Sequence, residues 1–96
     1  MITVNDSYII QVDRYNFIVC KNDPHTVIDS KTGRSRTEYT VVGYLGSLEN
    51  ALFLIRRLMI RDGLENADTD LVGALRTVRQ ITDEFERTMK RVLGED

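Results

Sequence analysis

The hydrophobic period of the chain changes at Gly46–Ser47, and this change limits the folds that the chain can adopt. Before this point apolar and polar residues alternate, and after it apolar residues recur at helical spacing. Alternation is typical of a half-buried strand, whereas a period of about 3.6 residues is typical of an amphipathic helix. A strand-rich first half followed by a helical second half predicts the α+β class.

The first half contains four strand-like segments separated by polar turns. They are Ser7–Val12, Tyr15–Lys21, Thr26–Ile28 and Thr37–Leu45. Consecutive strands joined by short turns predict a four-stranded antiparallel meander over residues 7–45. Both faces of the first two strands carry apolar residues, so the pattern leaves open which face the helices cover.

A polar hairpin tip, Asp29–Arg34, separates the last two predicted strands, and Gly33 within it is available for a positive φ. Lys31 and Arg34 in this tip form a basic cluster with Arg36. Guanidinium groups suit both carboxylates and phosphates. The cluster therefore predicts a contact with a nucleic-acid backbone or with an acidic protein surface.

The first predicted helix covers residues 47–62, with Ser47 as its N-cap and Gly63 just beyond its end. It is apolar over nearly its whole circumference, so it needs cover on more than one side. Its polar side combines aromatic, arginine and aliphatic residues, which are Phe53, Arg56, Arg57 and Ile60. This combination predicts a partner-binding surface, unless the second helix covers it within the monomer.

The second predicted helix covers residues 69–93 and carries a seam of apolar residues. Its members are Leu71, Leu75, Val78, Phe85, Met89 and Val92. A seam with a period of about 3.5 residues suits packing along another helix. Two choices stay open, since this other helix is either the first helix or its own copy in a homodimer. The predicted order is ββββαα, in a single domain over residues 1–96.

Size and composition agree with a folded domain, since the 96 residues are 42% hydrophobic and 29% charged. The longest apolar run, Ala51–Ile55, is too short to span a bilayer, and the first residues do not form a secretory signal. The single cysteine, Cys20, cannot form an intramolecular disulfide. These features predict a cytoplasmic protein with no membrane partner.

The sequence offers little for catalysis or for metal binding. A nucleophile needs a base within hydrogen-bond reach, and the only histidine, His25, lies in a proline turn five residues from Cys20. No third residue is placed to orient this pair, and no spacing typical of zinc or calcium ligands is present. We therefore expect a protein that is not an enzyme and that uses neither a metal nor a cofactor.

Aromatic residues of the predicted strands support an alternative function, which is the binding of single-stranded nucleic acid on the sheet face. They are Tyr8, Tyr15, Phe17, Tyr39 and Tyr44. Such rings stack on bases, and a basic cluster nearby would contact phosphates. The sequence pI of 5.4 opposes this alternative, because affinity for nucleic acid depends on neutralising phosphates.

Two stretches carry a resemblance to a known class of proteins. They are Tyr8-x-Ile10-x-x-Asp13-x-x-Asn16-x-x-Val19 and the strand-to-helix junction Gly43–Leu52, which reads GYLGSLENAL. With them, residues 7–62 resemble small accessory proteins of phages and prophages of Gram-positive bacteria. The resemblance implies a mobile-element origin and no catalytic residues, and such proteins are often inhibitors of host defence, including anti-CRISPR proteins, or regulators of host enzymes.

The leading hypothesis is a non-enzymatic interaction protein that binds and modulates a host protein. Its sharpest form is an anti-defence, anti-CRISPR-like inhibitor, and a homodimer through the helices stays open beside packing within the monomer. The predicted partner is a host protein, such as a nucleic-acid-binding defence protein, and binding of nucleic acid stays open as the alternative.

Overall fold

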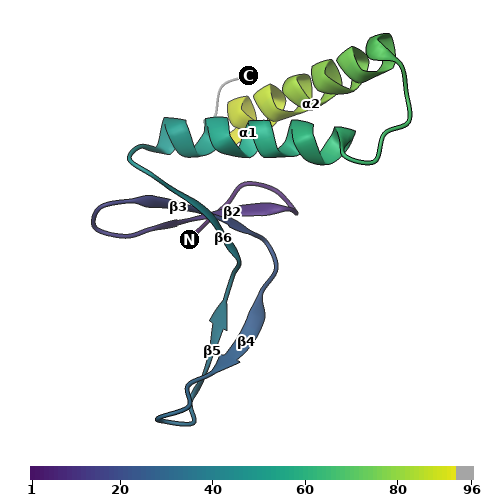
Figure 1. Cartoon of the computed structure of the whole chain (residues 1–96). Coiled ribbons are helices and arrows are strands. Elements are labelled where there is room, and N and C mark those ends of the chain that lie inside the picture. The colour runs from purple at the N-terminus through teal and green to yellow at the C-terminus, as the bar shows by residue number, and fades with distance from the viewer. Residues whose placement is uncertain (93–96) are drawn as a thin grey trace. The chain divides into compact units, whose positions relative to one another are not determined.

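Six strands and two helices make up the chain in a computed structural model that describes residues 1–92, with side chains described through Lys90 (Figure 1). The elements are β1 Ile2–Thr3, β2 Tyr8–Val12, β3 Phe17–Lys21, β4 His25–Ile28, β5 Ser35–Glu38, β6 Val41–Leu45, α1 Leu48–Leu64 and α2 Leu71–Val92. Strands come first and helices follow, which confirms the α+β class.

The strands form two antiparallel sheets rather than one meander. One sheet has four strands in the order β1-β2-β3-β6, and the other has only β4 and β5. The β4–β5 ribbon, called the arm below (residues 25–38), extends from the end of the four-stranded sheet (Figure 1). The predicted four-stranded meander is therefore wrong, although its first hairpin is present as β2 and β3.

The predicted strand Thr37–Leu45 is interrupted at Tyr39–Thr40, which divides it into β5 and β6. Pairing of β4 with β5 stops at His25 and Glu38, and the residue before His25 is Pro24. Proline has no N–H to donate to a ladder, so the ribbon cannot run on into the sheet as one hairpin. The short strand β1 was not predicted, because two residues are too few to show an alternation.

The chain divides into two compact units, Met1–Leu52 and Phe53–Asp96. In the first unit the core lies on β2 and β3. Its least exposed side chains, each at most 1% exposed, are Ile9, Ile10, Val19 and Cys20. Because neighbouring residues of a strand point to opposite faces, both faces of this strand pair are buried at their centre. The expectation of a single domain over residues 1–96 stays a prediction.

Helix α1 begins where the sequence predicts and ends later. The Ser47 hydroxyl accepts a hydrogen bond from the Asn50 N–H (3.1 Å), which confirms Ser47 as the N-cap. The helix continues through Gly63 to Leu64, so the prediction that Gly63 follows the helix is wrong. A Cβ at Gly63 would lie 2.7 Å from Ile81 Cδ1. This glycine therefore allows close approach of the two helices instead of ending the first one.

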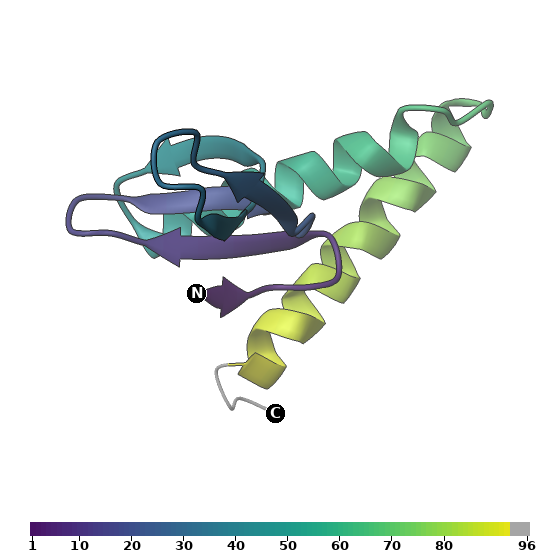
Figure 2. The same cartoon turned by 90° about the horizontal axis from the view of Figure 1, so that it is seen from below.

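In the second unit, α1 from Phe53 onward and α2 form a helical hairpin, joined by residues 65–70 (Figure 2). The Asp70 carboxylate accepts a hydrogen bond from the Gly73 N–H (2.8 Å) and caps α2. The predicted helix 69–93 thus appears as Leu71–Val92, and Leu93 lies outside the described residues. Neither helix of the described chain has an apolar stretch long enough to cross a membrane.

Candidate interaction surfaces

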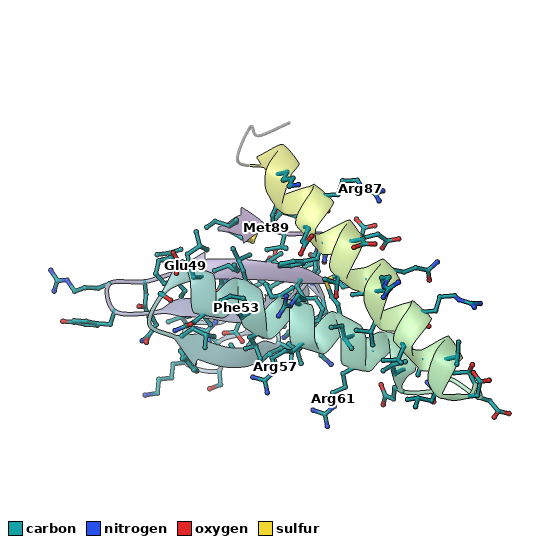
Figure 3. All side chains as sticks on the ribbon, turned by 90° about the horizontal axis from the view of Figure 1, so that it is seen from above. Glu49, Phe53, Arg57, Arg61, Arg87 and Met89 are labelled. Atoms are coloured by element: carbon teal, nitrogen blue, oxygen red, sulfur yellow. The ribbon has the colours of Figure 1, made fainter. Side chains whose placement is uncertain are left out.

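The predicted partner-binding residues of α1 lie together on one side of that helix. We call Phe53, Arg56, Arg57 and Ile60 the α1 stripe. Phe53 is 54% exposed and Arg57 is exposed, whereas Arg56 and Ile60 are half-buried. Phe53, Arg57 and Arg61 follow one another along the helix (Figure 3). Helix α2 therefore leaves the Phe53 ring accessible to solvent.

The side chains of Phe53 and Arg56 contact each other. The guanidinium carbon of Arg56 lies 5.4 Å from the centre of the Phe53 ring, within the range of a cation–π interaction. The Arg56 Nε atom is buried and has no hydrogen-bond partner among the described residues. Leaving a polar nitrogen unpaired costs about 1–3 kcal/mol. The contact with the Phe53 ring is thus the interaction observed for this guanidinium among the described residues.

The three predicted basic residues of the hairpin are all exposed on the arm. Lys31 and Arg34 lie in its tip, and Arg36 lies on β5. Arg36 Nε donates to Glu38 Oε1 over 2.7 Å, with both side chains largely exposed. Within the described residues, the other two cations have no ion-pair partner, so they carry the net positive charge of the tip.

The tip of the arm is held in one conformation by local hydrogen bonds. Asp29 accepts backbone N–H bonds from Lys31 and Gly33, at 2.8 Å each, through its carboxylate and its carbonyl oxygen respectively. The Asp29 N–H donates to the Arg34 carbonyl over 2.9 Å and closes the turn. Gly33 has φ +70°, which confirms the predicted use of a glycine there.

The base of the arm is closed by Asp23 and Thr40. The Asp23 carboxylate accepts the Thr40 N–H (2.8 Å) and also the Thr40 hydroxyl. These bonds from Thr40, the hydroxyl first and the N–H second, hold the pKa of Asp23 below its ordinary value, and the nearby His25 lowers it further. The contact joins residues 17 positions apart, which is why sequence patterns did not reveal it.

The predicted seam of α2 divides into a buried part and an exposed part. Val78 and Met89 are half-buried and Phe85 is buried, but Leu71 and Leu75 are 74% and 59% exposed. The side chain of Val92 lies outside the described residues. A straight helix drifts by about 20° per heptad relative to a seam with a 3.5-residue repeat. This drift carries Leu75 to the edge of the buried face, whereas Leu71 lies five full turns before Met89 on the same side of α2 and is exposed at the start of the helix.

The face of α2 that is covered follows helical spacing through the length of the helix. Its half-buried or buried residues are Gly73, Ala74, Thr77, Val78, Ile81, Thr82, Phe85, Thr88 and Met89. Thr77 and Ile81 are the residues that approach Gly63 of α1. Part of this face therefore packs against α1, and the face includes three of the predicted seam residues.

A second exposed surface was missed by the sequence argument. We call Leu71, Val72, Leu75, Arg76 and Arg79 the α2 flank. Val72 is 63% exposed, and a shallow pocket of about 310 Å³ is lined by Val72, Leu75, Arg76 and Arg79. The signal in the sequence was an apolar pair, Leu71–Val72, followed by arginines at helical spacing, but the heptad argument assigned its leucines to a buried seam.

The aromatic residues proposed for base stacking do not share one open face. Tyr8 is only 3% exposed, so its ring is not accessible. Phe17 pairs with Leu45 and Ile18 with Tyr44, so Phe17 and Tyr44 point to opposite faces of the sheet. Tyr15 is 78% exposed but lies in the turn between β2 and β3. Stacking of several bases along one sheet face therefore has little structural support.

Cys20 and His25 differ in their surroundings. Cys20 is fully buried, and burial followed by the negative charge of Asp23 raises the pKa of its thiol. A raised pKa leaves less of the reactive thiolate. His25 is exposed, and its Nδ1 lies 2.9 Å from the Asp23 carbonyl oxygen. Among the described residues, no group of three or more His, Cys, Asp or Glu side chains could hold a metal ion.

Comparison with known proteins does not indicate what these surfaces bind. No protein-family model, curated protein or solved structure matches the chain.

Proposed function

We propose that this chain is a non-enzymatic protein that binds another protein through the α1 stripe. The observation that carries the proposal is the exposed Phe53 ring with the Arg56 guanidinium stacked on it. Aromatic and arginine side chains are enriched among the residues that dominate binding energy at protein interfaces. An exposed ring that is already held by a neighbour also loses little freedom when a partner covers it.

The charge around the α1 stripe indicates the chemistry of the partner. Arg57 and Arg61 project from the same side of α1 (Figure 3), and both are exposed. An arginine presents a planar fork that pairs with a carboxylate through two parallel hydrogen bonds. We therefore expect the partner to offer an apolar recess for Phe53 with acidic side chains around it.

A narrower form of the proposal names the partner as a host protein that the chain modulates. It rests on the resemblance to phage and prophage accessory proteins, which covers residues 7–62 and includes the α1 stripe. In this form the chain acts as an anti-defence inhibitor, of which anti-CRISPR proteins are one kind. A rigid helix would cover the acidic surface of the host protein, and inhibition would follow from the loss of that surface.

The test is capture of a partner from host lysate by the tagged chain, with and without nuclease, together with matched variants. The proposal predicts one protein near stoichiometry that survives nuclease treatment and is lost with Arg57→Glu. The control is Arg87→Glu, because Arg87 is also an exposed arginine but lies on α2. Equal capture by all three chains would show that the α1 stripe does not bind the partner.

Contact with nucleic acid is a second candidate function, and the arm is the observation that favours it. Lys31 and Arg34 are exposed at its tip, and the turn that holds them is preformed. Cations at the end of a projecting ribbon suit contact with a phosphate backbone. This function predicts that nucleic acid co-purifies with the chain, that salt weakens binding steeply, and that Lys31→Glu with Arg34→Glu abolishes it.

A further inference from the structure

The α2 flank presents apolar side chains to solvent in a chain whose other helical apolar side chains are mostly covered. Leu71, Val72 and Leu75 are 74%, 63% and 59% exposed, and they lie within the first turns of α2. Contiguous exposed apolar residues beside charged ones mark an interaction surface. The pattern of charges around this surface indicates the chemistry of the partner that would cover it.

Charges of opposite sign lie at the two ends of the α2 flank. Asp68 and Asp70 precede its apolar residues, and its own Arg76 and Arg79 follow them. All four are exposed, and within the described part of the chain neither arginine has an ion-pair partner. A surface that is acidic at one end and basic at the other is complementary to an inverted copy of itself.

We propose that the α2 flank is the interface of a homodimer in which the first turns of two α2 helices pair antiparallel. A twofold axis between Ala74 and Leu75 places the apolar residues of the two copies together. With a rise of 1.5 Å per residue, Arg79 then lies about 7 Å past the axis and Asp70 about 7 Å before it. Arg79 of each copy is therefore level with Asp70 of the other along the helix axis, which brings the basic end of each flank beside the acidic end of its partner.

A parallel arrangement of the same helices is disfavoured by its charges. It would place Arg76 and Arg79 of one copy beside the same arginines of the other, and like charges at an interface are repulsive. A strongly acidic or a strongly basic partner would be repelled by one end of the flank. Because three apolar side chains per copy make a small interface, we expect association in the high-micromolar range.

The first experiment is sedimentation velocity on the full chain over a dilution series that reaches millimolar concentration. We expect a monomer–dimer equilibrium that Leu75→Glu weakens by at least tenfold. The matched control is Gln80→Glu, since Gln80 is exposed and lies about 140° around α2 from Leu75. Circular dichroism and urea unfolding check that both variants stay folded, which we expect because both positions are exposed.

Two outcomes of this experiment would overturn the proposal. A wild-type chain that stays monomeric at millimolar concentration would show that the flank is covered by something else, including the first unit of the same chain. A dimer that Leu75→Glu leaves unchanged would place the interface elsewhere on the molecule.

The second experiment tests the orientation by disulfide trapping, in which Leu75→Cys is compared with Glu86→Cys. Glu86 lies eleven residues, or about three turns, along the same side of α2. In the antiparallel dimer the two Leu75 positions are neighbours, whereas the two Glu86 positions are about 34 Å apart. We expect only Leu75→Cys to form a disulfide-linked dimer, and equal linking by Glu86→Cys would overturn the antiparallel arrangement. The native Cys20 is buried and does not compete.

Discussion

Two antiparallel strand pairs in this molecule have the same secondary structure and opposite surroundings. In β2–β3, Ile10 lies opposite Val19, and both side chains are 0% exposed. In β4–β5, Ile28 lies opposite Ser35, and Ile28 is 68% exposed. The first pair is stabilised by burial of apolar surface, whereas the second depends on its turn and on the contact at its base.

The difference shows that the residues that stabilise the fold are not the residues that are exposed to solvent and available for binding. Helix α1 shows the same separation within one element, since Ile55 is 0% exposed and Phe53, two residues away, is 54% exposed. Substitutions in the first set should change the free energy of unfolding. Those in the second set should change binding and leave unfolding almost unaltered.

The largest expected effect is on the free energy of unfolding, and it is seen when the same substitution, isoleucine to alanine, is made in each of the two strand pairs. Ile10→Ala removes a fully buried side chain, and we expect it to lower the free energy of unfolding by about 2–5 kcal/mol. Ile28→Ala on the arm should change it by less than about 0.5 kcal/mol. Urea unfolding of both variants measures the contrast, and similar losses would mean that the arm is part of the core.

A smaller loss of stability is expected from a substitution at the tip of the arm. Gly33→Ala places a side chain at φ +70°, which costs about 1–2 kcal/mol. Gly46→Ala is the control, because Gly46 has no positive φ and a Cβ there meets nothing within 4 Å. Hydrogen exchange of the Asp29 N–H reports on the turn. Unchanged protection of this N–H in Gly33→Ala would contradict the role of the glycine.

The base of the arm should respond to pH. The folded-state pKa of Asp23 is lowered, so its carboxylate stabilises the fold above its ordinary pKa, and this contribution is lost as pH falls through the lowered pKa. We expect the Thr40 N–H to lose exchange protection in that acidic range. Asp23→Asn should remove this pH dependence, and a pH dependence that persists in Asp23→Asn would assign it to another group.

The smallest effect is expected at the ion pair on β5. Arg36 and Glu38 have side chains that are 62% and 40% exposed, and such pairs contribute about 0–1 kcal/mol. Glu38→Gln should therefore leave the free energy of unfolding nearly unchanged in low and high salt. A loss well above this range in urea unfolding would mean that the pair fixes the shape of the arm.

Local chemistry in the sequence was enough to predict several parts of this fold. The cap Ser47 and the turn glycine Gly33 act within three or four residues, so a short window contains all the atoms involved. Features that depend on distant contacts were missed. At the interruption Tyr39–Thr40, Thr40 contacts Asp23, and at the end of α1 Gly63 lies close to Ile81.

The candidate surfaces were also predictable to different degrees, because some depend on local sequence and others depend on contacts between distant residues. The place of Phe53 and Arg57 on the polar side of one helix predicted a surface, but the sequence left open whether the second helix covers it. The α2 flank could not be recognised, because the heptad pattern counted Leu71 and Leu75 with the buried Phe85. Only the position of the partner helix determines which end of such a seam is covered.

The measurement that tests the central claim most directly follows one variant, Phe53→Ala, in two assays. The claim is that the α1 stripe binds a partner and contributes little to the fold. Affinity for the protein captured by the wild-type chain should fall by more than about thirtyfold, which corresponds to about 2 kcal/mol. The free energy of unfolding in urea should change by less than about 0.5 kcal/mol. Retained affinity, or a loss of stability as large as the loss of binding, would contradict the claim.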